Sequence, residues 1–102
     1  MINVIVTYRV NPQFVSENKA NINKFLEDFD KLDNSKFSYS VFFNKSENTF
    51  IHISNYADEE IQHELLNVPS FLKFQQKRDE SGLDGSHKVQ ILEHIGSTKQ
   101  IF

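Results

Sequence analysis

His52 is the residue of this sequence best suited to acid–base chemistry, and it lies in the middle of an apolar stretch, 49–55. An ordinary imidazole has a pKa near 6.5, so it can take up or give a proton near neutral pH. Tyr56 follows four residues later, which puts both side chains on one face of an extended strand. We therefore predict His52 as a catalytic base. A strand histidine also serves as a hydrogen-bonded structural residue or a dimer contact, and that alternative stays open.

The three other histidines do not suggest a metal site. His63 falls on the solvated side of a predicted helix, and His87 and His94 fall on opposite faces of the last predicted strand. No pair of these histidines has the spacing of zinc ligands, and the chain has no cysteine to supply thiolates. We expect neither a metal ion nor a bound cofactor.

Length, charge and composition limit the classes of function. A chain of 102 residues forms one domain with a modest core. Its net charge is −3 and its lysines are scattered, so the sequence offers no basic stripe for a nucleic-acid backbone. No apolar run reaches the length of a membrane span. We expect a cytoplasmic protein that binds neither nucleic acid nor membranes.

Alternating apolar residues predict four strands, each bounded by turn-forming residues. The predicted strands are 2–10, 37–43, 49–55 and 87–95. The polar stretch 44–48 is short, so the second and third strands should form a hairpin. Residues 97–102 follow as a short tail that ends in the apolar pair Ile101 and Phe102, and the domain itself should span 1–96.

Three helices are predicted between these strands. The first begins at Pro12 and continues to near Leu32, because apolar residues recur there at helical spacing. The second begins near Asp58, whose acidic first turn suits the helix dipole, and Pro69 ends it and begins a third. The apolar members of that third helix would be Phe71, Leu72 and Phe74. Its end is predicted at residues 82–83, where glycine followed by leucine is typical of a helix C-terminal cap.

The order βαββααβ predicts an α+β, ferredoxin-like fold, in which helices cover one face of a four-stranded antiparallel sheet. Apolar residues also fall on the other face, among them Ile5, Phe42 and Leu92. The third strand adds either Ile51 and Ile53 to that face or Phe50 and His52, because its register is open. Such a patch favours a homodimer through the sheet faces. The alternative is a monomer with one half-solvated sheet face.

One stretch after the third strand resembles a known family. The matching positions are Tyr56, Asp58, Ile61, Leu65, Pro69, Ser70, Phe71 and Phe74. Their spacing is similar to that of the antibiotic biosynthesis monooxygenase-like (ABM) domains, which form dimeric α+β barrels. Tyr56 stands where these domains tend to have tryptophan, and Leu65 and Ser70 stand where they have two histidines. The resemblance implies the dimeric barrel fold.

The resemblance also implies which activities to consider. Haem-degrading members use an asparagine, a tryptophan and an iron-binding histidine, and their spacing falls here on Tyr8, Tyr56 and Gln75. None of the three can replace a neutral imidazole on iron, so we expect no haem degradation. Other members oxygenate hydroxyaromatic compounds without a cofactor, which requires only a dry pocket and a base.

Two hypotheses of function follow from different classes. The first is a non-catalytic dimeric module that binds a small apolar or aromatic ligand or only assembles. The second is a cofactor-independent monooxygenase that acts on a lipophilic aromatic or quinone-like compound, with His52 as base. The expected pocket residues are Tyr8, Tyr39, Tyr56, Phe71 and Gln75. The loss of the family's polar positions favours the module. A cavity bordered by His52 and a tyrosine hydroxyl would favour the enzyme.

Overall fold

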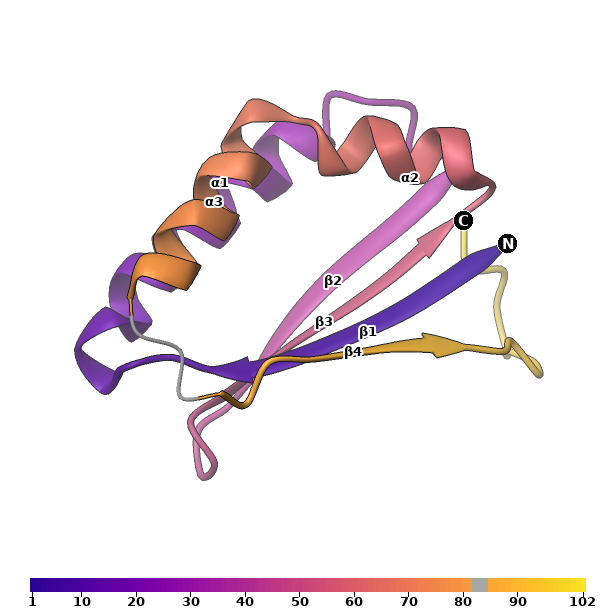
Figure 1. The fold of residues 1–102 in the computed structure, drawn as a ribbon. Helices are drawn as coiled ribbons and strands as arrows, with labels where there is room; N and C mark the ends of the chain where they lie inside the picture. The colour runs from indigo at the N-terminus through magenta and orange to yellow at the C-terminus, as the bar shows by residue number, and fades with distance from the viewer. Residues whose placement is uncertain (82–84) are drawn as a thin grey trace.

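The computed structural model describes residues 1–81 and 85–102. The elements are β1 (Ile2–Arg9), the 3-10 turn η1 (Pro12–Phe14), α1 (Val15–Phe29), β2 (Phe37–Asn44), β3 (Thr49–Tyr56), α2 (Glu59–Leu66), α3 (Pro69–Glu80) and β4 (Lys88–Leu92). The four strands form one antiparallel sheet in the order β2-β3-β1-β4. All helices lie on one side of this sheet, as Figure 1 shows. The predicted α+β, ferredoxin-like fold is confirmed.

The register of β3 decides which of its residues face the helices. His52 lies opposite Val6 of β1 and Val41 of β2. The ring of His52 contacts that of Phe74 of α3, with centroids 5.4 Å apart, so His52 faces the helices. Ile51 and Ile53 therefore belong to the open face of the sheet, since successive strand residues alternate between faces.

The first helix is shorter than predicted. It ends at Phe29 instead of near Leu32, because 3-10-type hydrogen bonds between residues three apart replace the helical bonds there. The amide of Leu32 donates to the carbonyl of Phe29 over 2.9 Å. Leu32 still packs against the core from this turn, so it keeps its apolar role without helical geometry. At the start, the side chain of Asn11 accepts from the amide of Gln13, as a cap.

The second and third helices begin as predicted. Asp58 caps α2 by accepting a hydrogen bond of 2.9 Å from the amide of Ile61. Val68 is extended and Pro69 occupies the first turn of α3. The prediction for Leu72 is wrong, since this side chain is 46% exposed. It lies about 100° around the helix axis from Phe71, which points into the core. The predicted cap at residues 82–83 lies outside the described residues.

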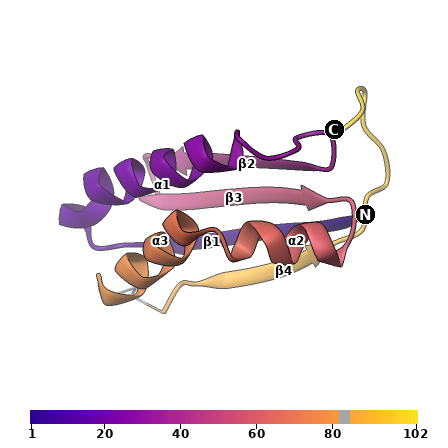
Figure 2. The same ribbon diagram turned by 90° about the horizontal axis from the view of Figure 1, so that it is seen from above.

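The last strand is also shorter than predicted, ending at Leu92 instead of residue 95. Leu92 pairs with Asn3, so β1 has almost no residues left to continue the ladder. β4 is the edge strand of the sheet and lies beside α2 and α3 (Figure 2). All five of its residues are exposed. The chain then turns back and brings the C-terminus near the N-terminus, with Ile101 and Phe102 half-buried.

The core between sheet and helices is mainly aromatic. The rings of Phe25 in α1 and Phe71 and Phe74 in α3 form its centre, with the Phe25 centroid 5.0 Å from that of Phe71 and 4.9 Å from that of Phe74. Tyr8 and Phe50 stack below them on the sheet, 5.5 Å apart. These tilted and stacked pairs stabilise the fold beyond their burial alone.

Within the described residues no helix has the length and hydropathy to cross a bilayer. The cytoplasmic location expected above stays a prediction.

Replacing Phe71 by alanine tests this packing. Phe71 is 4% exposed, so Phe71→Ala should lower the free energy of unfolding by about 3–5 kcal/mol, measured by chemical denaturation. Leu72→Ala is the matched control on the same helix and should cost less than about 1 kcal/mol. Equal losses for the two variants would contradict the observed orientation of α3.

Candidate functional site

A row of hydrogen-bonded side chains crosses the sheet beneath the helices. His52 of β3 lies between tyrosines of both neighbouring strands. Its Nε2 is 2.8 Å from the hydroxyl of Tyr8 in β1, and its Nδ1 is 2.9 Å from the hydroxyl of Tyr39 in β2. The Nδ2 of Asn18, on α1, donates to the Tyr8 hydroxyl over 3.0 Å. The sequence predicted three of these four residues as site residues but placed Asn18 only on a helix face.

Burial keeps His52 neutral. The side chain is 2% exposed, and its pKa is lowered to about 3, mainly by desolvation and further by the charge of Arg78 and by His87. Both ring nitrogens are also occupied by tyrosine hydroxyls. His52 is therefore a weak proton acceptor at neutral pH, and its geometry suits a relay better than a free base.

The three tyrosines stay in their neutral phenol form. Burial raises the pKa of Tyr8 and of Tyr39 well above that of an exposed tyrosine, and it also raises the pKa of Tyr56. Each hydroxyl can thus donate one hydrogen and accept others, but none is a phenolate that could remove a proton from a ligand.

A cavity of about 220 Å³ lies beside this row, between the sheet and the helices α2 and α3. Of the predicted pocket residues, Tyr39, Tyr56, Phe71 and Gln75 line it together with His52. The structure places Tyr8 behind His52, with no surface exposed. The remaining walls include four aliphatic residues of β1 and β4, so a ligand would meet apolar groups together with polar ones at defined places.

Arg78 is a wall residue that the sequence reasoning missed. Its side chain is 7% exposed, and its guanidinium carbon lies 5.4 Å from the ring centroids of both Tyr8 and Phe74. Its Nε donates to Asp79 Oδ1 over 3.1 Å. The available signal was spacing: Arg78 follows Phe74 by four residues and Phe71 by seven, so all three fall on one face of α3. Arg78 brings a positive charge to the cavity.

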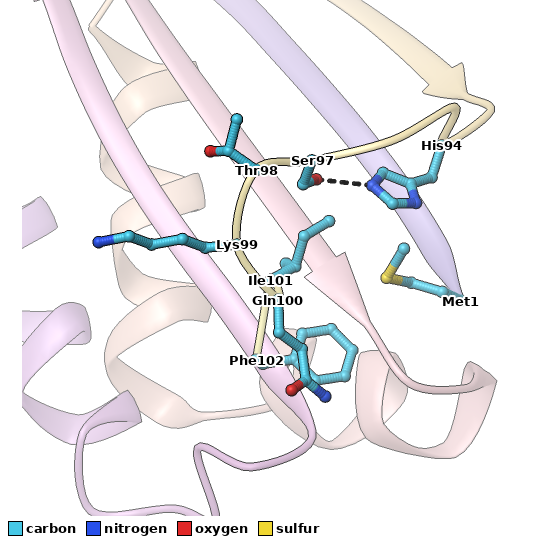
Figure 3. Close-up of a pocket in the computed structure, with 8 residues that line it drawn as sticks. All are labelled: Met1, His94, Ser97, Thr98, Lys99, Gln100, Ile101 and Phe102. Carbon is cyan, nitrogen blue, oxygen red and sulfur yellow. Dashed lines mark hydrogen bonds between the residues drawn. The ribbon is translucent and has the colours of Figure 1, made fainter.

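Among the described residues, the other histidines make no hydrogen bond to the row, although the ring centroid of His87 lies 6.4 Å from that of Tyr8. His63 is exposed on α2, and His87 lies at the cavity wall near β4. His94 belongs to a separate open hollow formed with the C-terminal tail, where its Nε2 is 2.7 Å from the Ser97 hydroxyl (Figure 3). Within residues 1–81 and 85–102, no group of three His, Cys, Asp or Glu side chains could hold a metal ion.

The fold matches solved structures, although no family model and no curated protein matches the sequence. Rv0793 from Mycobacterium tuberculosis has a TM-score of 0.79 at 16% identity, covering 96% of this chain and 98% of that one. A candidate antibiotic biosynthesis monooxygenase from Nitrosomonas europaea has a TM-score of 0.80 at 11% identity, covering 94% and 100%. A crystal structure described as an antibiotic biosynthesis monooxygenase gives 0.78 at 12% identity, covering 94% and 100%. At such identities these matches confirm the predicted ABM-like fold.

The buried neutral histidine predicts a pH dependence of stability. In the unfolded chain His52 regains a pKa near 6.5, whereas in the folded protein the pKa is about 3. Between these values the unfolded state binds more protons, so the free energy of unfolding decreases as the pH falls, by up to about 1.4 kcal/mol per pH unit. Denaturant titrations between about pH 6.5 and pH 4.5 measure this slope.

His52→Gln should flatten the slope, because glutamine can bond to the tyrosines but does not titrate there. His63→Gln is the matched control at an exposed helix position and should leave the slope as in the wild type. A slope unchanged in His52→Gln would show that His52 is not the titrating group.

Proposed function

We propose that this protein binds a small aromatic compound in the cavity between the sheet and helices α2 and α3. The observation that carries the proposal is a cavity of about 220 Å³ whose lining is largely apolar and includes the polar side chains of Tyr39, His52 and Arg78. Its volume is below the roughly 300–1,000 Å³ of most ligand pockets, which favours a small ligand. Phe71 and Phe74 offer flat surfaces that suit an aromatic ring.

The charge of the cavity favours an oxygen-bearing ligand. Arg78 carries the positive charge in the wall, and it lowers the pKa of both Tyr8 and Tyr39 against the larger effect of burial. The same charge would stabilise an ionised hydroxyl or a polarised carbonyl on a bound ring. A hydroxyaromatic or quinone-like compound meets both requirements.

A second candidate function is oxygenation of such a compound without a cofactor. Two observations favour it: the cavity borders His52 and a tyrosine hydroxyl, and Arg78 would lower the pKa of a bound phenol. The phenolate would be oxidised by dioxygen, with one oxygen atom entering the ring to give a quinone and the other leaving as water. Two of the structural neighbours described above carry the name antibiotic biosynthesis monooxygenase, one of them as a candidate, which agrees with this chemistry.

Filling the cavity tests the binding site. Ser54 lines the cavity and is 4% exposed, so Ser54→Leu should occupy the space of the ligand and abolish binding of 1,4-naphthoquinone, measured by quenching of tyrosine fluorescence. Ser40→Leu is the matched control, since Ser40 is exposed on β2 and does not line the cavity. Equal binding by both variants would place the site elsewhere, and no binding by the wild type would reject this ligand class.

We also propose that the open face of the sheet pairs with a second copy of the chain. Phe42 is 56% exposed, Leu92 43% and Ile53 36%, and all three lie on the face away from the helices. Neighbouring apolar side chains of this size on one face are typical of an interface. A two-fold pairing would cover the same patch on both copies.

Sedimentation at micromolar concentration should therefore give about twice the chain mass of 11.9 kDa. Ile53→Lys should shift the protein to a monomer, because it places a charge in the proposed interface. Ile91→Lys is the matched control, since Ile91 is exposed but points to the helix side of the sheet. A wild-type monomer would contradict the proposed pairing.

A further inference from the structure

The hydrogen bonds of the buried row Asn18, Tyr8, His52 and Tyr39 show which atom donates each hydrogen. Asn18 donates to the Tyr8 hydroxyl, and Tyr8 is 0% exposed. A phenol has one hydrogen, and a buried donor needs an acceptor within the protein. The Oδ1 of Asn18 has no hydrogen-bond partner among the described residues, so it does not accept this hydrogen. Within the part of the chain that the structure describes, the acceptor that remains for this hydrogen is Nε2 of His52, 2.8 Å away. Tyr8 therefore donates to His52.

The direction of donation continues across the imidazole. His52 is neutral, so it has one ring hydrogen, and this hydrogen lies on Nδ1 when Nε2 accepts. Nδ1 is 2.9 Å from the Tyr39 hydroxyl and donates to it. The row thus runs from Asn18 through Tyr8 and His52 to Tyr39. The hydrogen of the Tyr39 hydroxyl is used by no member of the row.

We infer that Tyr39 donates this hydrogen into the cavity, so the ligand must present an acceptor oxygen, as in a quinone carbonyl or an aromatic oxyanion. This inference rests on the proposed binding function and names the ligand class for the same site. Tyr39 lines the cavity and is partly exposed. Arg78 lines it too, and a guanidinium can only donate. Both groups therefore select for an acceptor.

Asn18 is then a positioning residue. It is not among the described residues that line the cavity, and it reaches the ligand only through Tyr8 and His52. Its amide presents a donor to Tyr8, which leaves the Tyr8 hydrogen for His52. An acceptor at the same place would take the hydrogen of Tyr8. The direction of donation along the row would then reverse, and Tyr39 would donate to His52 instead of to the ligand.

The tautomer of His52 tests the direction of the row without any ligand. Nitrogen-15 NMR of the full chain should show Nε2 unprotonated and Nδ1 protonated in the wild type. A wild-type Nε2–H tautomer would overturn the inference. This measurement needs no variant, so it decides the direction even where a substitution unfolds the protein.

Asn18→Asp tests the positioning role, because it replaces the donor amide by an acceptor of the same shape. The tautomer of His52 should change to Nε2–H in this variant. Asn21→Asp is the matched control, since Asn21 is half-buried one turn further along α1 and shows no hydrogen bond to the row. If the folded Asn18→Asp variant keeps the wild-type tautomer of His52, Asn18 does not set the direction of hydrogen donation in the row.

The ligand class is tested with two probes of the same ring system, 1,4-naphthoquinone and naphthalene, of which only the quinone has acceptor oxygens. The wild type should bind the quinone more tightly. Tyr39→Phe should reduce the ratio of the two affinities about two- to tenfold, as expected for one hydrogen bond. An unchanged ratio would overturn the acceptor requirement.

A result in which neither probe binds would overturn the proposed function and the ligand class together. The His52 tautomer would still report the direction of the row, so the two failures are distinguishable. The chain has no cysteine, so thiol addition cannot consume the quinone probe.

Discussion

Tyr8, His52 and Tyr39 meet only when β3 lies in one register between β1 and β2. The side-chain period of a strand is two residues, so a slip by one would turn His52 to the open face and bring Ile51 and Ile53 under the helices. That alternative would also turn Phe50 and Tyr56, both buried in the observed register, out of the core. It would also leave the tyrosine hydroxyls without their central partner, at about 1–3 kcal/mol for each buried group left unpaired. The hydrogen-bonded row and the burial of Phe50 and Tyr56 therefore favour the same register of β3.

The aromatic core beside the row does not fill all of the space beneath the helices. Phe25, Phe71 and Phe74 pack closely over His52, with the ring centroids of Phe25 and Phe74 4.9 Å apart. Towards β4 the cover of the helices ends, and the wall consists of Arg78 and exposed strand residues. The cavity lies at this boundary. Burial beside the cavity raises the pKa of Tyr39 and lowers that of His52. The guanidinium of Arg78 offers a positive charge to a ligand in the cavity.

Polar groups on the two faces of the sheet have different roles. On the helix side, the row connects three strands and helix α1. On the open side, Asn55 donates to Asn3 over 2.8 Å, and Asn3 donates to the carbonyl of Leu92 over 3.2 Å. These bonds connect β3, β1 and β4 and hold the short edge strand in place. The apolar residues beside them remain uncovered, which is the basis of the proposed pairing.

Local chemistry was enough to determine the element order and most boundaries. The acidic start of α2 near Asp58, Pro69 at a first helical turn and the alternation in β1 act through neighbours a few residues away. The sequence shows those neighbours directly. The ends of α1 and β4 were wrong because they depend on a turn and on the length of a partner strand. The inward face of His52, the contact of Asn18 with Tyr8 and the burial of Arg78 were decided only by the tertiary structure. They arise where segments distant in sequence pack together, and no local pattern fixes which of two strand faces is covered.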